Sequence, residues 1–226
     1  VLSMRWTDAL HDNSTRRPVE VIGLGDQQYY VWTPCRQPRE SSQERLKRAR
    51  ESQVWTQASQ RVGRIPQGVQ WIRVADREAD IYEYLLSCQE LGHGFVIRAA
   101  KDRALSHPET GKRTGRLFTA ARSAVPLGEF TLELRQRPQH PARTAHLCVS
   151  ATAVTLSSPW RPGYGRGRKP PIQCTAVRVW EAAPPDTGDR LEWILLCYAD
   201  VTLFAQARAC ALQYSTRWMI EEYHRR

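Results

Sequence analysis

The chain has 226 residues, and its 33 Lys or Arg against 23 Asp or Glu give a formal net charge of +10. This length suffices for one or two domains with a substantial core, and the basic balance favours a polyanionic partner. No apolar run approaches the roughly 18 to 20 residues that a membrane span requires. The six cysteines include no Cys-x-x-Cys spacing, which argues against a structural zinc site. We therefore expect a cytoplasmic protein with reduced cysteines.

The N-terminal part divides into two predicted sections. Residues 1–35 are predicted to form strands, with a turn around Gly23 to Asp26 before the aromatic stretch at 27–32. Residues 36–65 are strongly polar, and the stretch from Ser41 to Ser59 predicts a helix whose charged residues face solvent.

The next segment places an acidic residue at a predicted sheet edge. Residues 71–75, Trp-Ile-Arg-Val-Ala, predict a short buried strand, and from Glu78 onward apolar residues recur at helical spacing. Asp76 therefore follows a strand and precedes a helix, which is where active-site groups collect in open α/β sheets. The structural alternatives are that Asp76 caps the helix and that Asp80 is a first-turn charge favoured by the helix dipole.

Residues 101–190 have a different composition. Apolar segments separated by Pro- and Gly-rich turns predict strands at 130–134, 145–156 and 172–180. Residues 101–180 contain 14 Lys or Arg against 4 Asp or Glu, a local balance of +10 that equals the whole-chain excess. Such a segment would bind phosphates through counterion release, with an affinity that falls steeply with salt. The alternative is a basic protein that has no nucleic-acid partner.

The C-terminal segment carries a second motif. Residues 192–198 predict a strand, and the sequence from Thr202 onward predicts a long helix. On that helix Tyr214, Arg217 and Glu221 stand at i, i+3 and i+7, so an aromatic hydroxyl, a guanidinium and a carboxylate share one face. A carboxylate suits a divalent metal, and an Arg or Tyr suits a phosphate oxygen. The alternative is a solvated Arg–Glu pair of the kind common on helices.

Together the two motifs, Asp-Arg-Glu-Ala-Asp at 76–80 and Tyr-x2-Arg-x3-Glu at 214–221, resemble the insertion sequence 4 family of bacterial cut-and-paste transposases. Segments at 22–32, 95–98 and 191–196 resemble connecting strands of that family, so the likeness runs along most of the chain. It implies an α/β fold, an RNase H-like mixed sheet with flanking helices that is interrupted by a β-rich insertion. Residues 1–100 and 191–226 would form the core, and residues 101–190 the basic insertion.

The resemblance also implies a function and the residues that carry it. The function is metal-dependent strand cleavage and transfer at transposon ends, with Mg²⁺ or Mn²⁺ held by the catalytic residues Asp76 and Glu221. Partners would be double-stranded DNA at inverted-repeat ends and target DNA near the bacterial nucleoid, with a homodimer in the full-length protein. Four residues would contact DNA, and they are Tyr214, Arg217, Arg98 and Trp193.

Two of these residues have plain structural alternatives. Trp193 matches a tryptophan that stacks near a flipped base in the family, and it could equally be a core aromatic of a strand. Arg98 matches an arginine directed to the DNA end, and it could equally be a surface charge at a strand edge.

The chain departs from the family pattern at several points. The family's first catalytic Asp has no match, because Asp8 and Asp12 lie too close to the Gly-Leu strand at 23–24 and lack the expected flanking residues. The signature's final Lys would fall at 228, beyond Arg226. The chain begins with Val and stops within a predicted helix, so we interpret it as an internal fragment or a decayed remnant that is not expected to catalyse transposition alone. Two other classes stay open, a noncatalytic DNA-binding protein derived from a transposase and an unrelated RNase H-like nuclease.

Overall fold

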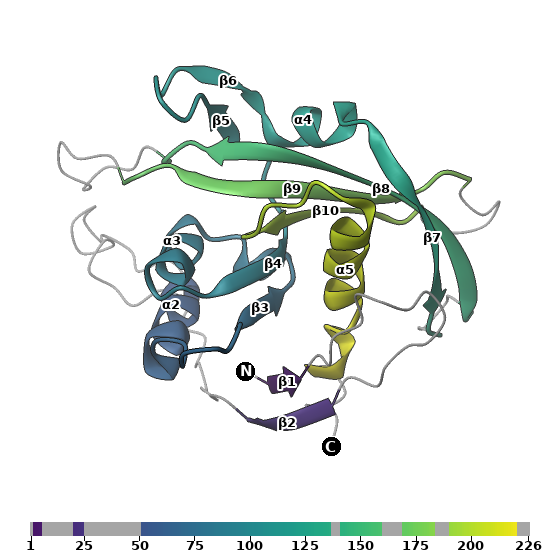
Figure 1. Ribbon diagram of the computed structural model, residues 1–226, viewed down its shortest axis with the longest axis horizontal. Coiled ribbons are helices and arrows are strands. Elements are labelled where there is room, and N and C mark those ends of the chain that lie inside the picture. Colours follow the sequence, from purple (N-terminus) through teal and green to yellow (C-terminus); the bar gives the residue numbers. More distant parts are fainter. Residues whose placement is uncertain are drawn as a thin grey trace, which may run out of the picture.

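The computed structural model describes residues 2–5, 20–24, 51–136, 141–159, 169–183 and 190–220. They form a mixed α/β structure, which confirms the predicted fold class at that level (Figure 1). The strands of the large sheet are β3 (Ile72–Ala75), β4 (Gly94–Arg98), β5 (Ala104–Ser106), β6 (Arg113–Arg116), β7 (Pro126–Leu134), β8 (Arg143–Leu156), β9 (Ile172–Glu181) and β10 (Glu192–Cys197). The helices are α2 (Glu51–Val62), η1 (a 3-10 helix, Arg77–Ala79), α3 (Tyr82–Glu90), α4 (Leu117–Ser123) and α5 (Phe204–Ser215).

The eight strands pair in the order β3-β4-β10-β9-β8-β5-β6, and β7 also pairs with β8. β3 and β4 are parallel, and the other pairs are antiparallel. β9 occupies one edge of β8, while β7 and β5 pair with successive parts of its other edge. Because β9 pairs along β10, strands from the predicted insertion and the predicted core lie in one sheet.

Helices cover both faces of this sheet, and strand alternation supplies an apolar layer to each (Figure 1). On β4, Phe95 and Ile97 pack into the core cluster that includes α3 and α4. Val96, between them, packs into the second cluster with α5. α2 lies outside α3, where the rings of Trp55 and Tyr84 are 5.6 Å apart. The sheet is therefore buried on both sides, as an α/β architecture requires.

The N-terminal predictions are only partly within the described residues. β1 (Leu2–Arg5) and β2 (Glu20–Leu24) form an antiparallel two-stranded sheet, which confirms strands in this region. The second half of the predicted turn at 23–26, the aromatic stretch at 27–32 and the first part of the predicted 41–59 helix lie outside the described residues. α2 ends at Val62 because Gly63 adopts φ +80° and closes the helix through its N–H to the Ser59 carbonyl oxygen.

The helix predicted from Thr202 onward is interrupted. α5 begins at Phe204 and ends at Ser215, a turn follows at Thr216 and Arg217, and residues 218–220 are helical again. The hydroxyls of Ser215 and Thr216 donate to the carbonyl oxygens of Leu212 and Gln213, both at 2.7 Å, and these bonds compete with the regular helix. Tyr214 and Arg217 consequently do not share a face of one continuous α-helix.

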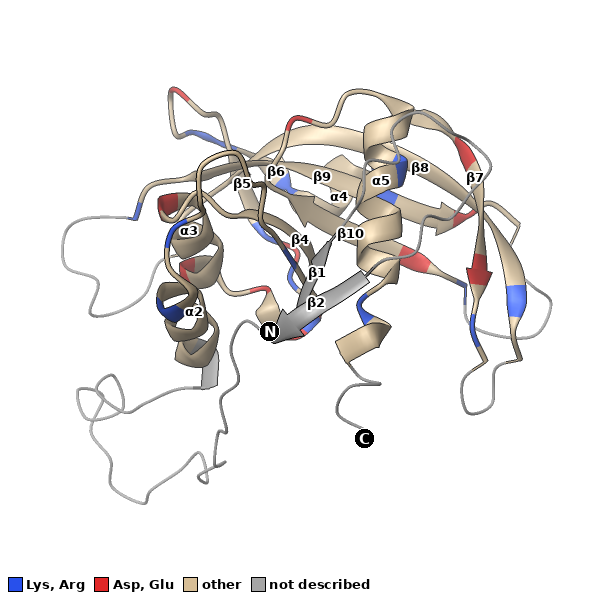
Figure 2. Cartoon of the chain, turned by 60° about the horizontal axis from the view of Figure 1, so that its bottom comes forward, with Lys and Arg blue, Asp and Glu red and all other residues tan. Residues whose placement is uncertain are grey.

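Acidic and basic side chains are interspersed over the sheet. Figure 2 shows acidic positions along β7 beside a basic position at the start of β8. Arg143 forms a two-pronged ion pair with Glu181, a carboxylate that is 1% exposed. Arg103 is likewise paired with the buried Asp80. Part of the basic excess of the predicted insertion is therefore committed to structural ion pairs. Within the described part of the chain, no helix is both long enough and apolar enough to cross a membrane.

Candidate active site

Asp76 lies at the carboxyl end of β3, as predicted, and it also caps the helical turn that follows. Its Oδ1 accepts a hydrogen bond from the Glu78 N–H at 3.1 Å, which makes it the N-cap of η1. Such a cap contributes about 1 kcal/mol. The Asp76 side chain is nevertheless 39% exposed, so one carboxylate edge remains accessible to solvent.

Asp80, the second aspartate of the motif, is a structural residue. Its Oδ2 accepts hydrogen bonds from the N–H groups of Ala100 and Lys101 at 2.8 and 3.0 Å, and its side chain forms a buried ion pair with Arg103. The carboxylate thus joins the start of α3 to the chain that leaves β4. The alternative of a first-turn helix charge does not hold, because Asp80 is the C-cap of η1 and precedes α3. Its burial requires the full pairing that these contacts provide.

Arg217 contacts Asp76, with 3.7 Å between Nη1 and Oδ2. The two residues are far apart in the sequence, and the packing of α5 against the sheet brings them together. The Arg217 side chain is 22% exposed, and a partly exposed pair of this length contributes at most about 1 kcal/mol. A phosphate or a cation can therefore compete for either partner at small energetic cost.

Arg98 leaves the sheet at the same end as Asp76. Ala75 pairs with Ile97 in the parallel β3–β4 ladder, so the next residue on each strand, Asp76 and Arg98, stands level with the other. Arg98 Nη2 donates to the carbonyl oxygen of Glu192 at 3.1 Å. The ends of β3 and β4 and the beginning of β10 therefore meet at one end of the sheet.

Trp193 and Tyr214 meet on the α5 side of this sheet end. Their ring centroids are 5.0 Å apart in an edge-to-face arrangement, a favoured geometry for aromatic pairs. Tyr214 is only 4% exposed, whereas Trp193 is partly buried and packs against the α5-side cluster. Tyr214 is therefore less accessible to a phosphate than Trp193 is.

The turn after α5 carries an interaction that sequence reasoning missed. The guanidinium carbon of Arg135, just beyond β7, lies 3.4 Å from the ring centroid of Trp218. Arg217 and Trp218 are consecutive, and they contact the end of β3 and the end of β7 respectively. The turn therefore spans two distant strands, which holds Arg217 in place beside Asp76. Nothing in the sequence spacing of residues 135 and 218 indicates this pairing.

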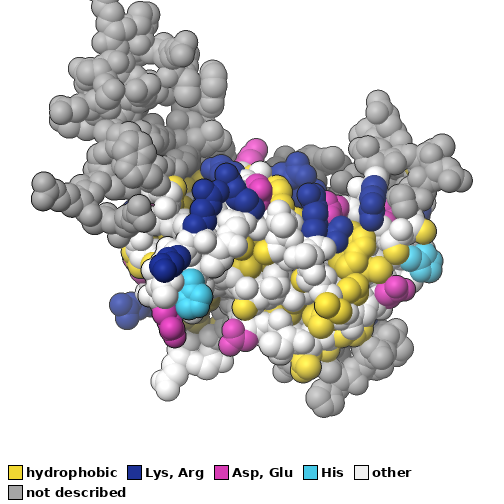
Figure 3. All heavy atoms as spheres, turned by 90° about the horizontal axis from the view of Figure 1, so that it is seen from above, with side chains coloured by type: hydrophobic (Ala, Val, Ile, Leu, Met, Phe, Trp, Pro, Cys, Tyr) yellow, Lys and Arg dark blue, Asp and Glu magenta, His cyan; other side chains and the backbone are white. Residues whose placement is uncertain are grey.

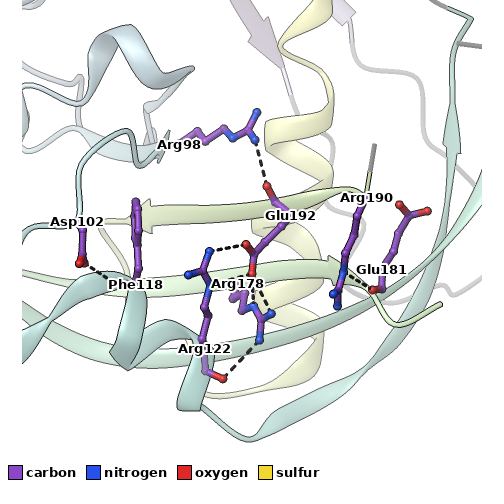
Figure 4. Close-up of polar contacts among 8 residues, drawn as sticks. All are labelled: Arg98, Asp102, Phe118, Arg122, Arg178, Glu181, Arg190 and Glu192. Atoms are coloured by element: carbon purple, nitrogen blue, oxygen red, sulfur yellow. Dashed lines mark hydrogen bonds and ion pairs between the residues drawn. The ribbon is translucent and has the colours of Figure 1, made fainter. Parts of the chain in front are cut away.

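Glu192, at the beginning of β10, forms hydrogen bonds with arginine side chains (Figure 4). Its Oε1 accepts hydrogen bonds from Arg178 Nε at 2.9 Å and Arg122 Nε at 3.2 Å, and its Oε2 accepts from Arg122 Nη2 at 2.7 Å. These hydrogen bonds, led by the one from Arg122, lower the pKa of Glu192 below its ordinary value. The same contact raises the pKa of Arg122. Sequence reasoning counted both arginines within a basic segment but could not find their shared partner, because the register of β9 with β10 decides it.

The predicted metal site can be located only in part. Glu221 lies outside the described residues, and the last described residue, Ile220, directly precedes it. Among the side chains that the structure does describe, no group of three or more His, Cys, Asp or Glu is arranged to hold a metal ion. No protein-family model matches the sequence.

Proposed function

We propose that this chain carries the catalytic core of a DNA transposase of the insertion sequence 4 family, with an RNase H-like fold. The reaction would be cleavage and transfer of DNA strands at transposon ends. The observation that supports it best is the contact between Asp76 and Arg217 at the end of β3, since these two residues come from the two separate motifs.

Neighbouring contacts support the same site. Arg98 stands level with Asp76 on the adjacent strand, and Trp193 packs on Tyr214 one layer away. All five residues thus lie at one end of the sheet, on or beside α5. The structural alternatives, such as a solvated ion pair on a helix or a surface charge at a strand edge, concern single residues. They do not explain why these five residues lie close together.

One potential ligand of a divalent metal ion lies at this sheet end among the described residues. Asp76 has a partly exposed carboxylate. Among the described residues its only charged partner is Arg217, with which it forms a weak ion pair. We propose that Asp76 and Glu221 hold Mg²⁺ or Mn²⁺, ions that prefer carboxylate oxygens. When bound, such ions activate the attacking water or hydroxyl and stabilise the leaving oxygen.

The chain's own residues would bind and orient the DNA. Arg217 would release Asp76 and bind a phosphate oxygen. A guanidinium binds phosphate more strongly and with a more defined geometry than the ammonium group of a lysine does. Arg98 would contact the neighbouring backbone. Trp193, at the surface of the α5-side cluster, would offer its ring to an unstacked base for about 1 to 3 kcal/mol.

A second function is supported by the bonding of Asp76. Its carboxylate already caps η1 and faces a guanidinium, which is also what a purely structural aspartate would do. The alternative is a noncatalytic DNA-binding protein derived from a transposase, in which the fold and basic surface are kept and the metal chemistry is lost.

Manganese binding distinguishes the two functions. The assay is electron paramagnetic resonance titration of Mn²⁺ in the presence of a duplex. We expect Asp76→Asn and Glu221→Gln each to weaken Mn²⁺ binding at least tenfold. Asp102→Asn is the matched control, because Asp102 is exposed and its Oδ1, a hydrogen-bond acceptor for the Phe118 N–H, is retained as an amide oxygen. Equal Mn²⁺ binding by the wild type and Asp76→Asn would rule out the metal site. Salt-dependent DNA binding that survives both substitutions would then favour the noncatalytic alternative.

A further inference from the structure

Three arginines surround Glu192, and only Arg98 was expected to contact DNA. The Glu192 carbonyl oxygen accepts from Arg98, and its carboxylate accepts from Arg122 and Arg178 (Figure 4). The cluster therefore holds three guanidinium groups against one carboxylate. Its excess positive charge sits directly beside the end of the sheet that carries Asp76.

The three arginines come from successive elements across this sheet end. Arg98 closes β4, Arg178 lies on β9 opposite Ile194 of β10, and Arg122 lies in the last turn of α4. Glu192, the first residue of β10, stands between them. The cluster thus continues from the Asp76 side of the sheet to the side that α4 covers.

Arg122 is the member best placed to bind a ligand. Its side chain is 53% exposed, and Glu192 occupies its Nε and Nη2. Its Nη1 donates to no acceptor in the described part of the chain. The Phe118 ring, 5.8 Å from the guanidinium carbon, flanks it. Because contacts on two sides already restrict this guanidinium, it loses little further conformational freedom when its solvent-facing donors bind an anion. The smaller entropic cost favours binding.

Arg178 supports this arrangement from below. Its side chain is 15% exposed, its Nη1 donates to the Arg122 carbonyl oxygen at 3.4 Å, and its guanidinium lies 4.2 Å from the centre of the Trp180 ring. It therefore fixes both Glu192 and the end of α4. We regard Arg178 as a positioning residue and Arg122 as the residue that contacts the ligand.

The surrounding surface continues the positive charge. Seen from above, Lys and Arg side chains form a row over the face that carries α4 and the β5–β6 hairpin (Figure 3). The exposed basic residues of these elements and their connections are Lys101, Lys112, Arg113, Arg116 and Arg122. An extended row of this kind matches a polymer with regularly spaced charges better than it matches a small anion.

We propose that Arg98 and Arg122, organised by Glu192, form a phosphate track that carries a nucleic-acid backbone from Asp76 across β10 to α4. The track rests on the proposed function, because it binds the same DNA whose reacting phosphate lies at Asp76. It assigns to Arg122, Arg178 and Glu192 roles in guiding the DNA that flanks this phosphate. An acidic protein partner is the competing occupant of this surface.

Binding of a fluorescein-labelled duplex by fluorescence anisotropy tests the track. The buffer contains EDTA, so the result does not depend on metal chemistry. We expect Arg122→Gln to weaken binding several-fold and to reduce the slope of log K against log salt by about 0.9, the value for one lost phosphate contact. Arg64→Gln is the control, since Arg64 is also an exposed arginine but follows α2, outside this row. We expect it to change affinity less than twofold.

Three outcomes would overturn the track. The first is equal weakening by Arg122→Gln and Arg64→Gln, which would indicate general charge attraction. The second is full affinity in Arg122→Gln. The third is displacement of the duplex by polyglutamate as effectively as by unlabelled duplex of equal charge, which would favour an acidic protein. If Asp76→Asn bound Mn²⁺ as well as the wild type while Arg122→Gln still weakened duplex binding as expected, only the metal chemistry would be rejected.

Neither substitution of Arg122 is expected to unfold the protein, and a second variant, Arg122→Lys, separates the charge of the side chain from its geometry. In Arg122→Gln the Glu192 carboxylate keeps Arg178, so no buried charge is stranded. Arg122→Lys retains the charge but loses the planar fork that binds Glu192 through two atoms. We expect its affinity to lie between those of the wild type and Arg122→Gln, and wild-type affinity in Arg122→Lys would contradict a role for the fork.

Discussion

Substitution of Asp80 tests whether the two aspartates of the 76–80 motif have different roles. The Asp80 side chain is 0% exposed, and it satisfies two backbone N–H groups and the Arg103 guanidinium. Removing one partner of a buried, hydrogen-bonded ion pair costs about 3 to 5 kcal/mol. We therefore expect Asp80→Ala to lower the free energy of unfolding by that amount. Asp76→Ala, which removes a cap and a weak ion pair, should cost only about 1 to 2 kcal/mol.

The assay is urea unfolding followed by far-UV circular dichroism, with the free energy taken from linear extrapolation. Because typical domains have only about 5 to 15 kcal/mol of stability, Asp80→Ala could leave too little folded protein to measure. Asp80→Asn then serves, since it keeps one acceptor oxygen and loses the charge, and we expect a cost of about 1.5 to 3 kcal/mol. Equal destabilisation by the Asp76 and Asp80 substitutions would refute the division of roles.

Two further perturbations probe the packing of the sheet and its helices. Gly128→Ala would place a Cβ 2.6 Å from Phe204 Cδ2, so we expect α5 to shift at its first turn and urea unfolding to show a loss of about 1 to 3 kcal/mol, and no loss would contradict the tight packing of β7 on α5. His93 is buried, and its Nδ1 accepts a hydrogen bond from Arg73 Nε at 3.2 Å. Burial lowers the pKa of His93 below its ordinary value of 6.5. The nearby charge of Arg73 lowers this pKa further, and the hydrogen bond to the Gly63 carbonyl oxygen opposes the shift. The unfolded chain therefore binds the proton more readily, and stability should fall as pH drops from about 6.5 towards the lower folded pKa. The urea midpoint of His93→Gln should change less between pH 7 and pH 5 than that of the wild type, and identical pH profiles would contradict this assignment.

Local patterns in the sequence predicted those elements whose side chains contact near neighbours. The strand at 72–75 and the helix after it were predicted because an apolar run is followed by helical spacing, and the structure confirms both. The long strands β8 and β9 were predicted from their apolar runs between turns. α4 was missed because seven residues give too short a periodic signal.

The remaining differences come from interactions between distant residues or from local competition. The hydroxyls of Ser215 and Thr216 end α5 where periodicity alone predicted continuation. The partner of Asp80 lies beyond β4, and the partners of Glu192 depend on strand register. For the candidate site, sequence reasoning named residues that the fold brings together in two pairs, Asp76 with Arg217 and Trp193 with Tyr214. It could not find Arg135 and Trp218, which meet only through tertiary structure.

The most direct measurement is the anomalous diffraction of Mn²⁺ in crystals of the protein with a bound duplex. The proposed function predicts a manganese peak at the end of β3, with carboxylate oxygens of both Asp76 and Glu221 at about 2.1 Å, the distance expected for small divalent ions. A structure in which these two carboxylates point to opposite sides of the sheet, with no manganese at Asp76, would contradict it.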